Sequence, residues 1–192
     1  MNLPVKFFTG LHQPSDAKHF AAAFVSWVRL RTRRSAMVIG DWIMDSGAFS
    51  ELSQHGRYRD SVAVYAREIR RWATNGSGNL LAAVSQDWMC EPFIVAKTGL
   101  SVEIHQRNTI ERYDALLEEQ LPVYIMPVLQ GFDPTDYVRH IAMYGDRLAP
   151  GAWVGVGSVC KRNGTPNQVA AVLLAINVAR PDLRLHGFGL KT

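Results

Sequence analysis

The chain has 192 residues, of which 47% are hydrophobic, 20% charged and 10% aromatic. These proportions exclude a disordered tail, a collagen and a disulfide scaffold, and we expect one globular domain over residues 1–192. No apolar run approaches the ~20 residues that cross a bilayer, and the N-terminus lacks the apolar stretch of a signal peptide. With Cys90 and Cys160 as its only cysteines, the chain is expected to be a cytoplasmic protein in a reducing setting, without a membrane partner.

The charge is mildly basic, with 21 Lys and Arg against 17 Asp and Glu and a net charge of +4. Two groups of arginines stand out in the sequence, Arg29, Arg31, Arg33 and Arg34 in the first and Arg67, Arg70 and Arg71 in the second. Because arginine binds phosphate oxygens with a planar fork of donors, such groups are typical of nucleic-acid-binding surfaces. The alternative interpretation is an ordinary solvated loop and a solvated helix face.

Apolar runs and amphipathic stretches alternate along the chain. In chain order, the predicted elements are strand Val5–Gly10, helix Ser15–Ala23, strand Phe24–Val28, strand Trp42–Gly47, helix Arg59–Thr74, strand Leu80–Ser85, helix Ser101–Gln120, strand Pro122–Gly131, helix Pro134–Leu148, strand Trp153–Ser158, helix Pro166–Ala179 and strand Arg184–Gly189. Several strands are apolar at consecutive positions, which is typical of strands buried on both faces of a parallel sheet. This alternation predicts an α/β fold built from βαβ units.

The helix boundaries follow from capping residues. Ser101, Asp133 and Thr165 are the expected N-caps, and proline follows the latter two. In helix Ser101–Gln120, the expected buried stripe consists of Ile104, Ile110, Tyr113, Leu116 and Leu117. Seven strands are more than a doubly wound sheet of this length usually has and one fewer than a (β/α)8 barrel needs, so periodicity leaves both architectures open.

Polar and glycine residues end nearly every predicted strand. In a parallel α/β fold, function collects at these carboxyl ends, and two carboxylates, Asp45 and Asp87, could face one opening. Each residue also has a structural interpretation, because Asp45 could cap a helix and Gln130-Gly131 could form a turn. The segment Gly155–Ser158 could allow close packing or bind a phosphate through its backbone.

Histidines and known motifs carry less information. His12 and His186 lie at strand ends, whereas His140 falls on a predicted helix and is interpreted as a surface or packing residue. No grouping has the spacing of a zinc site, and there is no GxSxG elbow, P-loop or complete dinucleotide fingerprint. We therefore expect no metal and no cofactor.

The ordered strand ends resemble motifs of the tRNA-guanine transglycosylase superfamily. The matching segments are Asp45-Ser46-Gly47-Ala48-Phe49, Asp87, Val128-Leu129-Gln130-Gly131, Val154-Gly155-Val156-Gly157-Ser158 and His186-Gly187-Phe188-Gly189. The opening segment from Phe7 to Ser15 is most similar to the 7-deazapurine DNA-modification branch of that superfamily.

This resemblance implies a (β/α)8-type barrel that exchanges guanine for a 7-deazaguanine base in DNA or, as a second option, in tRNA. By resemblance, Asp45 is the general acid/base and touches the base, Asp87 accepts from the purine N–H edge, and Gln130 donates to its carbonyl oxygen. The backbone of Gly131 and Gly157 would approach the base closely. Further substrate-binding candidates are Ser46, Gly47, Ser158, His186 and Gly187. The expected nucleic-acid-binding residues are Arg29, Arg31, Arg33, Arg34, Lys161 and Arg162.

Two features depart from the family pattern. The cysteine and histidine zinc site of the tRNA branch is absent, and the nucleophilic Asp of the family would lie on an eighth strand beyond Gly189. We therefore expect seven βα strands with the eighth unit missing, so that the chain is a truncated piece, needs a partner protein or second copy, or is not catalytic. The alternatives are a non-catalytic nucleic-acid-binding subunit and an unrelated sugar-phosphate barrel enzyme.

Overall fold

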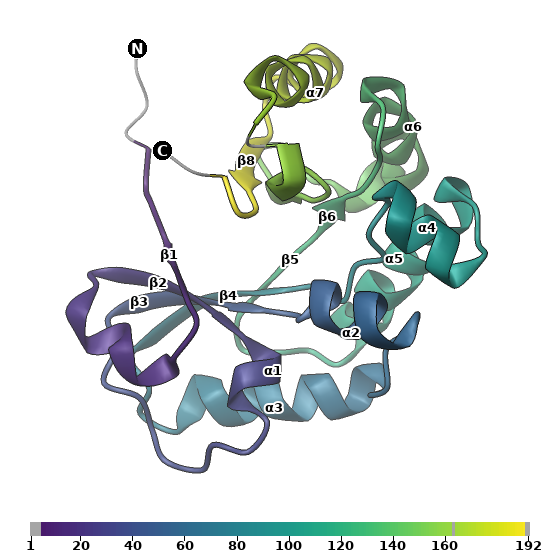
Figure 1. Cartoon of the computed structure of the whole chain (residues 1–192). Helices are drawn as coiled ribbons and strands as arrows, with labels where there is room; N and C mark the ends of the chain where they lie inside the picture. The colour runs from purple at the N-terminus through teal and green to yellow at the C-terminus, as the bar shows by residue number, and fades with distance from the viewer. Residues whose placement is uncertain (1–4, 163, 191–192) are drawn as a thin grey trace.

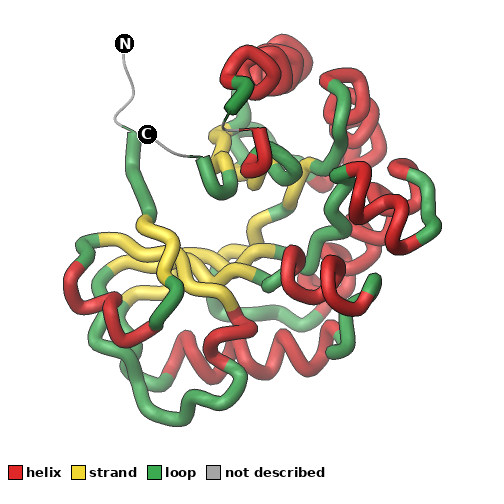
Figure 2. Tube along the Cα trace, viewed as in Figure 1, coloured by secondary structure: helices red, strands yellow, loops and turns green. Residues whose placement is uncertain are grey.

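A computed structural model gives the structure of residues 5–162 and 164–190, apart from the side chain of Lys161. Its strands form two sheets in which every neighbouring pair is parallel (Figures 1 and 2). The first sheet has the order β1-β2-β3-β4-β5 and the second β6-β7-β8. The strands are β1 Thr9–Leu11, β2 Ala22–Ser26, β3 Asp41–Asp45, β4 Asn79–Val84, β5 Tyr124–Met126, β6 Val128–Leu129, β7 Trp153–Val156 and β8 Arg184–Gly187.

Helices connect the strands and cover one side of them. Figure 1 shows α3 along the first sheet and α6 and α7 beside the second. The helices are α1 Trp27–Leu30, α2 Ala48–His55, α3 Val62–Thr74, α4 Pro92–Thr98, α5 Val102–Glu118, α6 Pro134–Tyr144 and α7 Pro166–Ala179, with 3-10 helices η1 Pro14–His19, η2 Gly145–Arg147 and η3 Cys160–Arg162. None of the helices in the described part of the chain has the length and apolar character to span a bilayer.

The first sheet is buried on both faces, as strand β3 illustrates. Trp42 and Met44 point to the helical side, where the ring of Trp42 lies 6.2 Å from the ring of Trp72 on α3. Ile43, between them, points to the opposite face and packs with Val84 and Met126. This double burial explains why the strand is apolar at consecutive positions and confirms the predicted parallel α/β arrangement.

The inner face also carries a group of rings that we call the inner aromatic cluster: Phe8, Phe24, Trp153, His186 and Phe188. Phe24 stacks on His186 at 5.3 Å between ring centroids, and Phe8 lies 6.1 Å from Trp153. The cluster thus joins the β1–β2 side of the molecule to the β7–β8 side. Within residues 5–162 and 164–190, β1 and β8 share no strand ladder, so the closed barrel stays a prediction.

The predicted strand Pro122–Gly131 is wrong as a single element, because it divides at Pro127 into β5 and β6. Proline has no N–H to donate to a ladder, and the backbone N–H and carbonyl of Val128 both bond to the Tyr144 hydroxyl, at 3.3 and 3.1 Å. The Pro127 carbonyl accepts from the Gly155 N–H at 2.8 Å, so the chain passes here from the first sheet to the second.

The structure also corrects the bounds of the first predicted strand and of the first predicted helix. The predicted helix Ser15–Ala23 is a 3-10 helix over Pro14–His19, and Ala22 already lies in β2. Strand β1 begins only at Thr9, four residues after the predicted start. The three-residue strand is too short to show a period, which is why its apolar flank led to a misplaced boundary.

Three helices, α1, α2 and α4, were not predicted. The predicted strand Phe24–Val28 is β2 over Ala22–Ser26, and Trp27 and Val28 already lie in α1. All three helices are short, and glycines with positive φ bound two of them: Gly47 at 78° and Gly56 at 65° flank α2, and Gly99 at 69° follows α4. Seven or eight residues contain about two turns, which gives little helical periodicity to recognise.

The long helix α5 confirms its N-cap but not its buried stripe. The Ser101 hydroxyl accepts from the Ile104 N–H at 3.3 Å, as predicted. Ile104 and Leu117 are 38% and 46% exposed. The polar residues His105, Gln106 and Thr109 are buried instead, alongside Ile110, Tyr113 and Leu116. The helix therefore presents a partly polar face to the strand ends.

Candidate functional site

Four predicted side chains meet at the carboxyl ends of the strands. Ser46 follows β3, Asp87 follows β4, Gln130 follows β6 and Ser158 follows β7. Together with Glu91 they form a connected set of hydrogen bonds, which we call the carboxyl-end network. All five are nearly inaccessible, with exposures from 0 to 4%. The network therefore joins the two sheets through polar contacts at the carboxyl ends of their strands.

Asp87 is the centre of this network. Its Oδ1 accepts from the Ser46 hydroxyl at 3.2 Å, and its Oδ2 accepts from the side-chain amide of Gln130. The Tyr58 hydroxyl donates to its backbone carbonyl at 2.8 Å. Burial, with a smaller contribution from the negative charge of Asp45, raises the pKa of Asp87 to about 7. Asp87 can thus change its charge near neutral pH.

Asp45 ends β3 and is half-buried beside the network. Its Oδ2 accepts from the Gly47 N–H at 3.1 Å, which is the turn contact expected of an aspartate after a strand. Burial raises the pKa of Asp45, and hydrogen bonds from Ser26 and from the backbone of Gly47 oppose that rise. Asp45 therefore serves the local turn and still places a carboxyl near Asp87.

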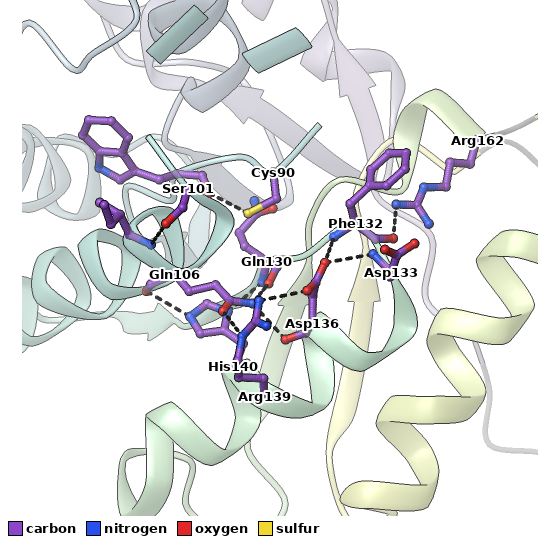
Figure 3. Close-up of polar contacts among 12 residues, drawn as sticks. Cys90, Ser101, Gln106, Gln130, Phe132, Asp133, Asp136, Arg139, His140 and Arg162 are labelled. Carbon is purple, nitrogen blue, oxygen red and sulfur yellow. Dashed lines mark hydrogen bonds and ion pairs between the residues drawn. The ribbon is translucent and has the colours of Figure 1, made fainter. Parts of the chain in front are cut away.

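The backbone of Gln130 is positioned by two residues of neighbouring helices (Figure 3). The Gln130 N–H donates to Nδ1 of His140 at 2.8 Å, and the Gln106 amide donates to the Gln130 carbonyl at 2.7 Å. Burial lowers the pKa of His140 to about 3, so the ring stays neutral and its Nε2 donates to the Gln106 carbonyl at 3.1 Å. His140 is thus a packing residue, as interpreted, but one that orients a site residue.

Ser158 completes the network in an unusual backbone conformation. Its φ is 56°, in the left-handed region that few residues other than glycine, asparagine and aspartate adopt. Its hydroxyl lies 2.7 Å from Oε1 of Gln130 and 2.8 Å from Oε2 of Glu91, and it accepts from the Cys90 N–H at 2.9 Å. Strained backbone of this kind is concentrated at functional sites.

Two predicted glycines are required by close approach. A Cβ on Gly157 would lie 2.1 Å from the Gln130 side-chain nitrogen, and one on Gly131 would lie 2.5 Å from Cβ of Asp136. Gly157 therefore leaves room for the Gln130 amide, while Gly131 leaves room for the first turn of α6. The predicted contact of both glycines with a base stays a prediction.

A family model described as DpdA, DeoxyPurine in DNA protein A, matches residues 3–192. The chain belongs to the DpdA family. No curated protein matches the chain. The family match confirms the predicted relation to the 7-deazapurine DNA-modification branch, whereas membership of the wider transglycosylase superfamily stays a prediction.

Two candidates of this DpdA-family chain lie apart from the network's contacts. His186 belongs to the inner aromatic cluster, where it contacts Phe8, Phe24, Trp153 and Phe188, and burial lowers its pKa to about 4. Gly187 faces Leu190, which a Cβ would approach to 2.4 Å. Both positions therefore have packing roles in the described structure.

The predicted nucleic-acid-binding residues occupy different environments. Arg31 pairs with Glu51 at 2.9 Å and with Asp60 at 2.5 Å. Arg33 donates to the carbonyls of Ser35 and Ala36, at 3.0 and 3.1 Å. These two guanidinium groups therefore already have partners within the protein.

The remaining cations differ from one another in exposure. Arg29 contacts His12 at 3.0 Å, and Arg162 is 7% exposed and donates to the Phe132 carbonyl (Figure 3). Arg34 is exposed and, with Arg67, lines a surface hollow of about 460 Å³. The side chain of Lys161 lies outside the described residues. Arg34 is thus the predicted residue best placed to meet a phosphate.

Sequence reasoning missed Glu91, Gln106 and Tyr58. Glu91 stands in front of Pro92 and begins α4, so the sequence gives it the pattern of an ordinary helix start. Tyr58 lies in a polar loop, and Arg112 from α5 packs 4.6 Å above its ring. The burial of Gln106 on α5 comes from the structure, and its polar side chain gave no signal in the sequence.

Proposed function

We propose that this DpdA-family protein exchanges guanine in DNA for a 7-deazaguanine base. The observation that carries this proposal is the hydrogen bond between Gln130 and Asp87 at the carboxyl ends of β6 and β4. The description of the family, DeoxyPurine in DNA protein A, points to a purine base of DNA as the substrate. An ionised carboxylate and a side-chain amide together complement the edge of guanine, which has N–H donors beside a carbonyl acceptor.

Base binding would replace contacts within the network. Asp87 would accept from the N–H edge of the base and Gln130 would donate to its carbonyl oxygen, whereas in the free protein these groups bond to each other. Since Asp87 and Gln130 are buried, the base enters only if these side chains separate. The bonds that are lost and formed are of the same kind, so their exchange has a modest net free energy.

The chemistry would be two successive displacements at the sugar anomeric carbon. A nucleophile expels guanine with inversion and the incoming base displaces the nucleophile with a second inversion, as in a retaining glycosidase. We assign Asp45 the proton transfer at the base, because it lies beside Asp87 and burial raises its pKa. We assign the nucleophile to none of the described residues.

The proposed architecture is a (β/α)8-type barrel. The sequential parallel order of the strands, the helices on one face and the inner aromatic cluster on the other support this interpretation. The substrate base would be turned out of the DNA stack to reach the strand ends, and Arg34 would bind a neighbouring phosphate.

Binding of a labelled base tests the site, because the nucleophile is assigned to none of the described residues. The chain is titrated with labelled guanine or 7-deazaguanine, with and without a DNA duplex, and bound base is measured for wild type and for Asp87→Ala. We expect wild type to bind the base, a loss of affinity of about 10- to 100-fold in Asp87→Ala, and no loss in Asp114→Ala, which removes a carboxylate paired with Arg147. Label transferred into the DNA would exclude the alternative, a non-catalytic nucleic-acid-binding subunit, and wild type that binds no base would overturn the proposal.

A further inference from the structure

Two buried carboxyl groups lie at the ends of one hydrogen-bonded chain. The side-chain amide of Gln130 contacts Asp87 on one side and lies 2.7 Å from the Ser158 hydroxyl on the other. That hydroxyl lies 2.8 Å from Oε2 of Glu91. Asp87 is 4% exposed and Glu91 is 2% exposed. The chain therefore connects Glu91, outside the predicted site, to the residue predicted to bind the base.

The number of available hydrogen atoms limits which groups can donate and which can accept in this chain of hydrogen bonds. Ser158 has one hydroxyl hydrogen, but Oε1 of Gln130 and Oε2 of Glu91 are both acceptors when Glu91 is ionised. The Cys90 N–H already occupies one of its lone pairs. One of the two short contacts thus requires another hydrogen, which either Glu91 or a turned Gln130 amide can supply.

In the first arrangement, Glu91 carries the proton. Its O–H donates to Ser158, Ser158 donates to Oε1 of Gln130, and Nε2 of Gln130 donates to ionised Asp87. Every donor and acceptor in the chain then has a partner of the opposite kind. In this arrangement Gln130 presents its NH2 group, and Asp87 its charge, at the position where the proposed base binds.

In the second arrangement, Asp87 carries the proton and every bond is reversed. Protonated Asp87 donates to Oε1 of Gln130, Nε2 of Gln130 donates to Ser158, and Ser158 donates to ionised Glu91. The amide of glutamine has nearly the same shape after a half-turn, so the same atomic positions suit both arrangements. No covalent bond changes except the two O–H bonds of the carboxyls, whose proton exchanges through water.

We propose that Asp87 and Glu91 share one proton through Ser158 and Gln130, so that Glu91 is a positioning residue that decides which end of the Gln130 amide faces the base. This inference rests on the proposed function for its consequence, but the shared proton is a property of the free protein. When Glu91 holds the proton, the site complements guanine. When Asp87 holds it, both the carboxylate charge and the amide donor are lost from the base.

Other groups face the same chain and belong to its pH dependence. Among the described residues, the titratable and charged groups around it include the following: Asp45, Tyr58, Tyr65, Cys90, Arg112, Asp136, Tyr137, Arg139, His140, Tyr144 and Arg162. Burial raises the pKa of both Tyr58 and Cys90, so these stay neutral near pH 7. Asp45 is the group whose charge opposes ionisation of Asp87 directly.

The test is the titration of Asp87 in the free 192-residue protein, monitored by carboxyl 13C NMR with labelled aspartate. Glu91→Gln removes the carboxylate that accepts from Ser158 in the second arrangement and can place an NH2 donor there instead, so the first arrangement is favoured. We expect the Asp87 midpoint to fall by about one pH unit or more, a tenfold change in proton affinity. Glu68→Gln, which removes a different buried carboxyl paired with Arg71, should leave it unchanged.

A double-mutant cycle separates the chain from a simple effect of charge. Ser158→Gly removes the hydroxyl and suits the φ of 56°, so the fold is retained. In the Ser158→Gly background, Glu91→Gln should shift the Asp87 midpoint by less than half as much as in wild type. An equal shift in both backgrounds, or no shift in either, would overturn the shared proton.

Guanine binding then tests the consequence. Wild-type affinity should fall as the pH drops through the Asp87 midpoint, and Glu91→Gln should keep its affinity to a pH about one unit lower, measured by calorimetry. If wild type binds no guanine at any pH, the proposed function fails, while the titration of the free protein still decides the shared proton. If guanine binds but its pH dependence is the same in both proteins, Glu91 does not position Gln130.

Discussion

The carboxyl-end network and the inner aromatic cluster both connect the first sheet to the second, but by different interactions. The network uses directional bonds between Ser46, Asp87, Gln130 and Ser158, each of which needs a specific donor and acceptor. The cluster uses ring contacts of 5.2 to 6.2 Å between centroids. Apolar contacts scale with buried area, whereas an unpaired buried polar group is destabilising. Stability and chemical selectivity are therefore assigned to separate regions of the molecule.

The largest expected effect is loss of stability on truncating the cluster. Phe8 is 9% exposed and contacts Trp153 and His186, so Phe8→Ala should lower the free energy of unfolding by about 3 kcal/mol. The neighbouring Phe7 is 56% exposed, and Phe7→Ala should change it by less than about 0.5 kcal/mol. Urea denaturation measures both. Equal effects would show that the ring contacts do not connect the sheets.

A substitution in the network should affect base binding more than stability. A Cβ on Gly157 would meet the Gln130 amide at 2.1 Å, so Gly157→Ala should displace that side chain and weaken guanine binding by about 10- to 100-fold. Gly10 has no atom near a Cβ, which makes Gly10→Ala the matched control. Calorimetric titration provides the measurement. Unchanged affinity in Gly157→Ala would mean that Gln130 does not contact the base.

The two regions should respond to pH in opposite directions. The pKa of Asp87 is raised from 3.8 to about 7, so the folded state binds the extra proton and stability falls as pH rises through this range. The pKa of His186 is lowered from 6.5 to about 4, so the unfolded state binds the extra proton and stability falls as pH drops through that range. Thermal melts at several pH values should show that Asp87→Asn removes the first dependence and His186→Phe the second. A variant that retains the slope it should lose would contradict the corresponding assignment.

The smallest effect concerns a surface that belongs to neither region. Arg34→Ala should weaken DNA binding several-fold and lower the slope of log affinity against log salt by about 0.9, the value for one phosphate contact. Arg107, which pairs with Glu103 on α5 and is 59% exposed, is the control, and Arg107→Ala should leave the slope unchanged. Fluorescence anisotropy with a labelled duplex measures both. Equal slopes in wild type and Arg34→Ala would exclude Arg34 from the DNA surface.

Much of this architecture is predictable from local patterns. Helix α7 has the predicted bounds, and the predicted cap Asp133 forms a full capping box with Asp136. The consecutive apolar runs locate the buried strands because burial on both faces removes any alternation. The division at Pro127 was not predicted, since it depends on the contact of Val128 with the Tyr144 hydroxyl, sixteen residues later in sequence.

The residues of the site also differ in whether the sequence could predict them. Asp87, Gln130 and Ser158 could be predicted because polar residues at the ends of apolar runs are visible in one dimension. Glu91 and His140 could not, because their roles come from the partners that the fold brings to them. His140 lies on α6 like any packing residue, and only its contact with the Gln130 N–H gives it a role in the site.

The division at Pro127 has a consequence for the order of folding. All five strands of the first sheet lie between Thr9 and Met126, and each pairs with its neighbour in sequence. Each of these pairs is parallel, so its partners are joined by a crossover and its contacts are non-local, while synthesis delivers the chain from its N-terminus. The five strands of the first sheet thus leave the ribosome before Gln130 and Ser158. Asp87 would spend that interval without its amide partner, so the chemistry of the site is assembled only when the second sheet is added.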